Sequence, residues 1–246
     1  MSLLDRANNA LTRRVRFKTA RSHLSAPVAS FTFDDFPRSA WTTGGPILAR
    51  YGARATYYVA GRFCDAQEDG LTYYGRDDLR ALHAAGHELG CHTFSHRRSP
   101  KVGSAELHAD LDRNADFVRE VLGDVRMTTF AYPYGEASPR TKALAGGRFA
   151  ASRGIKAGVN GRTLDLGQLK AVPLESRSWN APWIEREVAA AKADGGWLIF
   201  FSHDVSDSPS PYGATPAMLE HALAEVARAG IETLPVKHAF AKATFG

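Results

Sequence analysis

Short apolar runs alternate with amphipathic stretches of helical length along most of this chain. The run 197–201 (WLIFF) is apolar throughout, as in parallel strands that are buried on both faces. The stretch 75–85 has apolar residues on one helical face and stops at Gly86, where a helix-ending glycine is expected. The expected strands are 28–33, 55–60, 87–92, 127–131, 149–152, 169–174, 197–201 and 231–234, and the expected helices are 45–51, 75–85, 104–122, 141–145, 182–193 and 214–229.

Strand and helix alternate about seven times in this pattern. Such alternation favours parallel strands that are joined by right-handed crossover helices, and it predicts a closed or nearly closed barrel. In barrels of this kind the carboxyl ends of the strands build the active site. We therefore expect an α/β fold with its functional residues at or just after the ends of strands.

The composition fits one folded unit. With 246 residues, 44% of them hydrophobic, the chain can bury one substantial core, and no Pro/Ser-rich linker divides it. We expect a basic amphipathic arm over residues 1–25 and a catalytic barrel over residues 26–246, as a single domain. The two cysteines are too few for a disulfide framework. Neither an apolar run of secretory-signal length nor one of membrane-span length is present, so we expect a cytoplasmic protein with reduced thiols.

The positive charge is concentrated in the arm. The formal net charge is +5, and the first 25 residues carry six basic groups against one acid, so the charges of the remaining chain cancel. A nucleic-acid partner is not expected, because the folded body has no excess of basic residues. The apolar residues of the arm recur at helical spacing, which suits an anionic membrane surface, a second subunit or packing on its own barrel. These residues are Leu4, Ala7, Leu11 and Val15.

Three polar motifs follow expected strands. Asp34 and Asp35 end the first strand, His92 and His96 lie at and just after the third, and His203 follows the run 197–201. Each of these residues alone is more often structural, but three such coincidences in one chain indicate a site. Two imidazoles and one carboxylate are a typical ligand set for a catalytic divalent ion, with positions left open for water and substrate. We expect Asp35, His92 and His96 to hold such an ion, and zinc is the expected metal.

The remaining polar residues suggest an amide hydrolase. Asp34, beside the ligand Asp35, is free to take a proton from water. A backbone N–H in the turn at Tyr134 would stabilise a tetrahedral oxyanion, and His203 would protonate the leaving amine.

These motifs resemble those of the polysaccharide deacetylases of carbohydrate esterase family 4, which include chitin and peptidoglycan deacetylases. The resemblance rests on Thr-Phe-Asp-Asp (32–35), His-x-x-x-His (92–96), Pro-Tyr-Gly (133–135) and His-Asp (203–204), in that order. It implies a distorted (β/α) barrel of seven strands, a metal held by Asp35, His92 and His96, and an N-acetylated amino sugar as substrate. It also implies Asp34 as base, Tyr134 as oxyanion donor, His203 as acid, and Phe201 in the pocket for the acetyl methyl group.

Two motifs depart from the family pattern. The family's third motif usually carries an Arg that pairs with the catalytic Asp, whereas this chain has Phe-Ala-Tyr-Pro-Tyr over 130–134. Arg153, at the end of the next strand, either supplies that charge from another position or is a surface residue. The fourth motif aligns with residues 175–179 and keeps Glu175 and Trp179. We assign Phe201, Trp179 and Arg153 to substrate binding.

Two other functions remain open. The same fold could hydrolyse an amide on a substrate that is not a polysaccharide, because a fold does not determine a substrate. The chain could also be an inactive, metal-dependent carbohydrate-binding protein, although binding alone does not require both Asp34 and His203.

Overall fold

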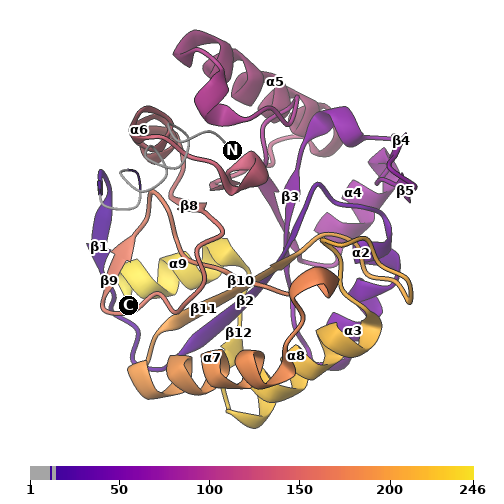
Figure 1. Cartoon of the computed structure of the whole chain (residues 1–246). Helices are drawn as coiled ribbons and strands as arrows, with labels where there is room; N and C mark the ends of the chain where they lie inside the picture. Colours follow the sequence, from indigo (N-terminus) through magenta and orange to yellow (C-terminus); the bar gives the residue numbers. More distant parts are fainter. Residues whose placement is uncertain (1–11, 13–14) are drawn as a thin grey trace.

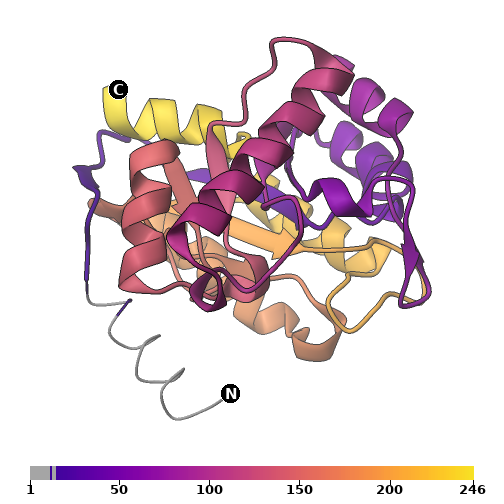
Figure 2. The same cartoon turned by 90° about the horizontal axis from the view of Figure 1, so that it is seen from above.

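A parallel sheet of seven strands in one path forms the centre of the protein. The computed structural model describes residue 12 and residues 15–246, and Figures 1 and 2 show the strands in the middle with helices around them. Neighbouring strands are parallel throughout. Their order is β10 (Val172–Pro173), β11 (Trp197–Ser202), β2 (Val28–Asp34), β3 (Thr56–Val59), β6 (Glu88–Cys91), β7 (Thr129–Ala131) and β8 (Ala151–Arg153). An eighth strand, β12 (Glu232–Thr233), pairs with the first residues of β2.

The two edges of the sheet approach each other. A parallel bridge joins Arg153, the last residue of β8, to Leu169, in the segment that leads into β10. Only 172–173 of the expected strand 169–174 is a strand, because the backbone N–H groups of Lys170 and Ala171 donate to a side chain and a carbonyl of the preceding loop. The expectation of a single-domain α/β fold with a distorted, nearly closed seven-stranded barrel is confirmed.

Helices surround the sheet in chain order. They are α2 (Ser39–Thr42), α3 (Gly44–Arg50), α4 (Arg76–Ala84), α5 (Ser104–Leu122), α6 (Pro139–Arg148), α7 (Ala181–Asp194), α8 (Pro216–Arg228) and α9 (Val236–Phe245). The described part of the chain also contains four short 3₁₀ turns: η1 (Gly61–Phe63), η2 (Ser99–Lys101), η3 (Pro133–Gly135) and η4 (Ser176–Ser178). Among the same residues, two small antiparallel pairs lie outside the main sheet: β1 (Thr19–Arg21) with β9 (Thr163–Asp165), and β4 (Gln67–Glu68) with β5 (Leu71–Thr72). Within the described residues, no helix is both long and apolar enough to cross a membrane.

Alternation along β2 decides which of its residues can reach the site. Phe31 and Phe33 belong to the core between the sheet and the outer helices. Val28 belongs to a second core with Trp197 and Phe201 of β11. Because side chains point alternately to the two faces of a strand, Asp34 lies on the same face as Val28, at the carboxyl end. The first carboxylate of the sequence motif therefore projects from the barrel side of the sheet.

The opposite end of the barrel is covered by α9, which the sequence pattern did not predict. Its buried residues Val236, Ala239 and Ala243 pack in the same core as Val28 and Trp197, the first residues of their strands.

The start of α9 also completes a buried polar network. The carboxylate of Glu88, 2% exposed, accepts hydrogen bonds from the hydroxyl groups of Thr56 and Thr129, at 2.7 and 2.5 Å. It also accepts one from the backbone N–H of Lys237, at 2.8 Å. The hydroxyl of Thr56 in turn accepts from the N–H of Val236. Burial raises the pKa of Glu88, and these donors oppose that effect.

Most of the expected N-terminal arm lies outside the described residues. Its described part is joined to the body: β1 pairs with β9, and the ammonium of Lys142 in α6 donates to the carbonyls of Thr12 and Val15. Lys142 is fully buried and also forms an ion pair with Asp165 at 2.5 Å. Residues 19–21 are thus part of the folded body, although the sequence placed them in the arm.

Candidate active site

A cleft of about 720 Å³ opens at the carboxyl ends of the barrel strands. It brings together seven of the nine residues that the sequence assigned to the site: Asp34, Asp35, His92, His96, Tyr134, Phe201 and His203. These residues come from the ends of β2, β6, β7 and β11 or from the turns that follow. The position of the cleft agrees with the rule that parallel barrels use this end for chemistry.

The oxygen Oδ1 of Asp35 lies between two imidazoles and has no hydrogen-bond partner. It is 3.5 Å from Nε2 of His92 and 3.1 Å from Nε2 of His96, and it is buried. Ligands about 2.0–2.1 Å from a tetrahedral ion are separated by roughly 3.3 Å, so these separations are those of a metal-ligand set. An unpaired buried carboxylate oxygen is costly. A divalent cation would satisfy it, so the three residues fit such an ion.

The protonation of the two histidines also suits a cation. Nδ1 of His92 donates to the carbonyl of Ala131 at 2.8 Å, which leaves the lone pair of Nε2 directed at the site. Burial, together with the nearby His92 and His203, lowers the pKa of His96 to about 2, so its ring is neutral. Burial raises the pKa of Asp35, with His92 and His203 opposing it. A bound cation would favour the ionised form.

Asp34 forms a buried ion pair with Arg153. Its Oδ1 accepts a hydrogen bond from Nη2 of Arg153, and the two side chains are 6% and 1% exposed. Burial acts to raise the pKa of Asp34, but the charge of Arg153, together with the nearby His92 and His203, lowers it overall. Arg153 is the residue paired in register with Ala131 on the neighbouring strand β7, within the motif that lacks the family's Arg. The guanidinium therefore reaches Asp34 from the next strand.

His203 is held by the loop that follows it. Its Nδ1 faces the carbonyl of Tyr212 at 3.2 Å, and its Nε2 lies 3.9 Å from Oδ2 of Asp35. Because a carbonyl can only accept, Nδ1 carries a proton and donates it to this carbonyl, while Nε2 faces the cleft. The loop is fixed by Asp204, 1% exposed, which accepts from both the N–H and the hydroxyl of Ser210.

Several backbones around the cleft are strained. Asp35, Phe36, Thr93, His96 and Tyr134 all have a positive φ, between 48 and 63°. Non-glycine residues with such φ values cluster at functional sites, where surrounding contacts keep them in place. Tyr134 lies in η3 with its ring 4.6 Å from that of His96, and its side chain is half exposed.

Two predicted substrate residues lie elsewhere. Trp179 is absent from the lining of the cleft and packs edge-on against His221, at 5.6 Å between ring centroids. Arg153 lies beneath Asp34, away from the open space. Glu175 does line the cleft and accepts a hydrogen bond from Nε of Arg177, at 2.7 Å.

The cleft walls include residues that the motifs did not identify. Arg62, Tyr73 and Tyr212 line it, and so does the tip of the β4–β5 hairpin. Tyr212 and Tyr134 are both about half exposed, and each has an arginine guanidinium over its ring, Arg177 at 4.1 Å and Arg98 at 4.3 Å. Tyr212, which follows Ser210 and Pro211, was the available signal, but the sequence of a loop does not reveal where an aromatic ring points.

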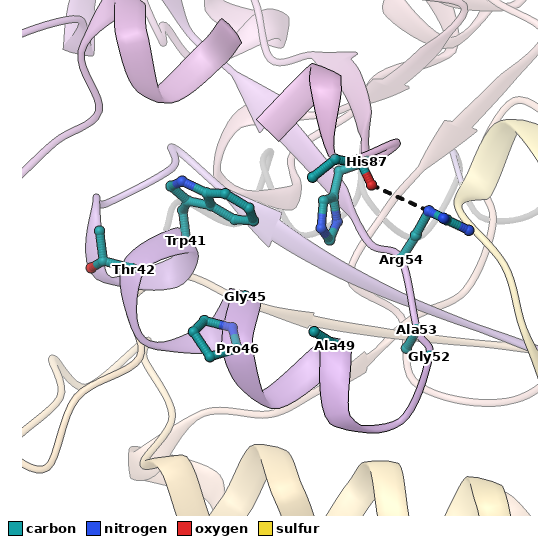
Figure 3. Close-up of a pocket in the computed structure, with 10 residues that line it drawn as sticks. Trp41, Thr42, Gly45, Pro46, Ala49, Gly52, Ala53, Arg54 and His87 are labelled. Carbon is teal, nitrogen blue, oxygen red and sulfur yellow. Dashed lines mark hydrogen bonds between the residues drawn. The ribbon is translucent and has the colours of Figure 1, made fainter. Parts of the chain in front are cut away.

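A second hollow lies at the opposite end of the strands (Figure 3). Trp41, Pro46, Ala49, Arg54 and His87 line it. Arg54 and His87 lie just before β3 and β6, so this hollow is at the amino ends of the strands. Nε of Arg54 donates to the carbonyl of Ala85, at 3.2 Å. None of the possible metal-ligand groups within the described residues includes a residue of this hollow, and we assign no chemistry to it.

Comparisons with known proteins add relatives in sequence and in fold. A chitin deacetylase of Arthroderma benhamiae is 29% identical over 108 residues, which are 43% of this chain and 27% of that protein. A bifunctional xylanase/deacetylase of Pseudobutyrivibrio xylanivorans is 24% identical over 105 residues, 43% of this chain and 16% of that protein. The matched segment thus spans only about a quarter of these relatives or less.

Solved structures share the fold at low identity. The CE4 domain of a multidomain xylanase from the hindgut metagenome of Trinervitermes trinervoides has a TM-score of 0.60 at 18% identity and covers 89% of this chain and 91% of its own. A CE4 family pseudoenzyme from Bacillus anthracis also has a TM-score of 0.60, at 13% identity, over 91% of this chain and 68% of its own. The fold alone therefore does not establish activity. The family model for polysaccharide deacetylases matches residues 21–147, just over half of the chain, so this protein belongs to the polysaccharide deacetylase family.

Proposed function

We propose that this protein is a metal-dependent hydrolase that removes the acetyl group from an N-acetylated amino sugar in a polysaccharide or oligosaccharide and releases acetate. The observation that carries the proposal is the unpaired Oδ1 of Asp35 between the Nε2 atoms of His92 and His96. Membership of the family supports the reaction, and the chitin deacetylase relative supports the substrate class.

Asp35, His92 and His96 would hold the ion, and we propose zinc because two imidazoles and one carboxylate with open positions suit it. When bound, the ion would polarise the amide carbonyl and lower the pKa of water. Asp34, kept ionised by Arg153, accepts the proton of the attacking water. The N–H of Tyr134 donates to the developing oxyanion, and Nε2 of His203 delivers a proton to the leaving amine nitrogen.

The apolar part of the cleft suits a small acyl group. Phe201 lines it, and its ring packs over the guanidinium of Arg153 at 5.0 Å, so the ring is fixed from below. We assign Phe201 to the contact with the acetyl methyl group. The zinc preference, the cytoplasmic location and the contacts of the N-terminal arm stay predictions from the sequence.

Acetate release from N-acetylglucosamine oligomers tests the proposal. The protein is assayed as purified, after chelation, and after zinc is returned, with His92→Ala and His96→Ala as matched variants and elemental analysis of each. We expect activity that chelation abolishes and zinc restores, and neither metal nor turnover in the variants. A parent protein that binds zinc but releases no acetate from these oligomers would contradict the substrate assignment. Equal metal content in parent and variants would contradict the ligand assignment.

A further inference from the structure

The turn between the two histidine ligands is strained at both ends. Thr93 and His96 have φ values of 63 and 48°, in the left-handed region that most residues avoid. Within the turn, the hydroxyl of Thr93 accepts from the N–H of His96 at 3.1 Å. One such bond does not hold two unfavourable residues, so contacts from outside the turn must fix its shape.

Those contacts come from Asp110 on α5, the long helix at the top of Figure 1. Its carboxylate accepts from the N–H of Phe94 at 3.0 Å, from the N–H of Ser95 at 3.1 Å and from the hydroxyl of Ser95 at 2.6 Å. The carboxylate of Asp110 thus accepts hydrogen bonds from three donors in the turn between His92 and His96. Hydrogen bonds to an ionised carboxylate are about twice as strong as neutral ones.

Asn114, one helical turn further along α5, holds the strands on which the turn stands. It is fully buried, and its amide donates to the carbonyl of Val59 at 2.9 Å and to Sγ of Cys91 at 3.2 Å. Its Oδ1 accepts from the N–H of Gly61 at 2.9 Å. Cys91 directly precedes His92. Residues four apart lie on one face of a helix, so Asp110 and Asn114 act on neighbouring parts of the same segment.

A close backbone approach completes the support. A Cβ on Gly61 would lie 2.5 Å from the ring of Phe94, and the N–H of Arg62 donates to the carbonyl of Phe94 at 3.0 Å. The guanidinium of Arg113 of α5 lies 3.7 Å from the centroid of the same ring. The turn is therefore held between η1 and α5.

We infer that Asp110 and Asn114 are positioning residues of the metal site, which fix the separation of His92 from His96 before an ion binds. Neither residue lines the cleft, so Asp110 acts through the turn and Asn114 acts through Cys91, the residue before His92. This inference rests on the metal ligands of the proposed function, and it extends them to a helix that none of the sequence motifs includes. Removal of such outer contacts typically lowers metal affinity 10–100-fold.

Zinc affinity, measured by competition with a chromophoric chelator, tests the inference without substrate. We expect Asp110→Ala to weaken binding by at least tenfold, Asp110→Asn to weaken it less because the amide oxygen still accepts, and Ser95→Ala to weaken it least. The matched control is Asp116→Asn on the same helix, whose side chain is 68% exposed and pairs with Arg119 one turn away. Its affinity should equal that of the parent.

The melting temperature with chelator and with saturating zinc separates positioning from general support. If Asp110 only supports the fold, Asp110→Ala would lower the melting temperature of the metal-free protein but leave the zinc affinity and the zinc-induced rise in melting temperature unchanged. That result would overturn the inference. If Asp110→Ala does not fold, Asp110→Asn and Ser95→Ala decide the question, and parental affinity in both overturns it. A parent that binds zinc tightly but is inactive would refute the deacetylase proposal and leave the inference intact.

Discussion

Replacing Arg153 by Met tests the buried ion pair on which the ionisation of Asp34 depends. Met has an apolar side chain of similar length, but it lacks the guanidinium that carries the charge, contacts the ring of Phe201 and donates to the carbonyl of Gly154. Because the two charged side chains are 1% and 6% exposed, the variant leaves a carboxylate buried without a partner. Loss of one member of a buried pair costs about 3–5 kcal/mol. In a domain of this size each kcal/mol corresponds to roughly 2–4 °C, so we expect the melting temperature to fall by on the order of 10 °C.

The effect should depend on pH with a defined sign. In the parent the pKa of Asp34 is lowered, so the pairing stabilises the fold fully above the ordinary pKa of 3.8, and this stabilisation is lost as the pH falls through the lowered pKa. In Arg153→Met, burial without the guanidinium raises that pKa, and protonation then relieves the unpaired charge. Urea unfolding of metal-free protein should therefore show a large stability gap at pH 7 that narrows toward pH 4.

A double variant provides the control. Asp34→Asn with Arg153→Met removes both charges and should recover much of the lost stability, because no unpaired ion remains. The reasoning is refuted if Arg153→Met is as stable as the parent at pH 7, or if the stability gap is the same at every pH. In active preparations the acidic limb of kcat/KM should move to higher pH in Arg153→Met.

Three further results are expected. Asp34→Asn should keep the metal and lose about 10²–10⁴-fold in kcat, whereas Asp35→Asn should lose metal in elemental analysis; the reverse result would exchange the two roles. Burial lowers the pKa of His87 to about 4. Its neutral form therefore stabilises the fold fully above about pH 6.5, and this stabilisation decreases as the pH falls toward 4. In thermal melts of His87→Asn, this fall in melting temperature between pH 6.5 and 4 should be absent. Gly213→Ala would put a Cβ 2.2 Å from the carboxylate of Asp204 and displace the loop behind His203, the proposed general acid, so kcat should fall on the order of 10²-fold at unchanged zinc content.

The elements that the sequence predicted well are long or flanked by strong signals. The helix expected over 104–122 has those bounds in the structure, because nineteen periodic residues are followed by a helix-ending Gly123. The ten-residue α9 escaped prediction, since its N-cap Pro235 provides no side-chain hydrogen bond and its buried face is mostly alanine.

The residues of the site also fall into those that the sequence predicted and those that it did not. Residues at strand ends, such as Asp35, were predictable because parallel strands gather their carboxyl ends at one edge. The residues of helix α5 that we infer to position the ligands were not predictable. Asp110 and Asn114 look in sequence like part of a solvated helical face, and only the packing of α5 against the turn reveals their partners. Trp179 was assigned from its place in a motif, but in the structure its ring packs against His221 of α8 instead.

The hydrogen bond from the N–H of Lys237 in α9 to the carboxylate of Glu88 affects the order in which the chain folds. The donor N–H of Lys237 follows Glu88 by 149 residues, so the two cannot meet until nearly the whole barrel has been synthesised. At about 5–20 residues per second, synthesis separates them by roughly 7–30 s. During that interval the carboxylate lacks this donor and the amino end of β2 lacks its cover, as does that of β11 once it has been synthesised. The barrel should therefore become protease-resistant only after α9 has emerged, and ribosome-bound chains arrested before and after residues 236–245 would reveal a late, single gain of resistance.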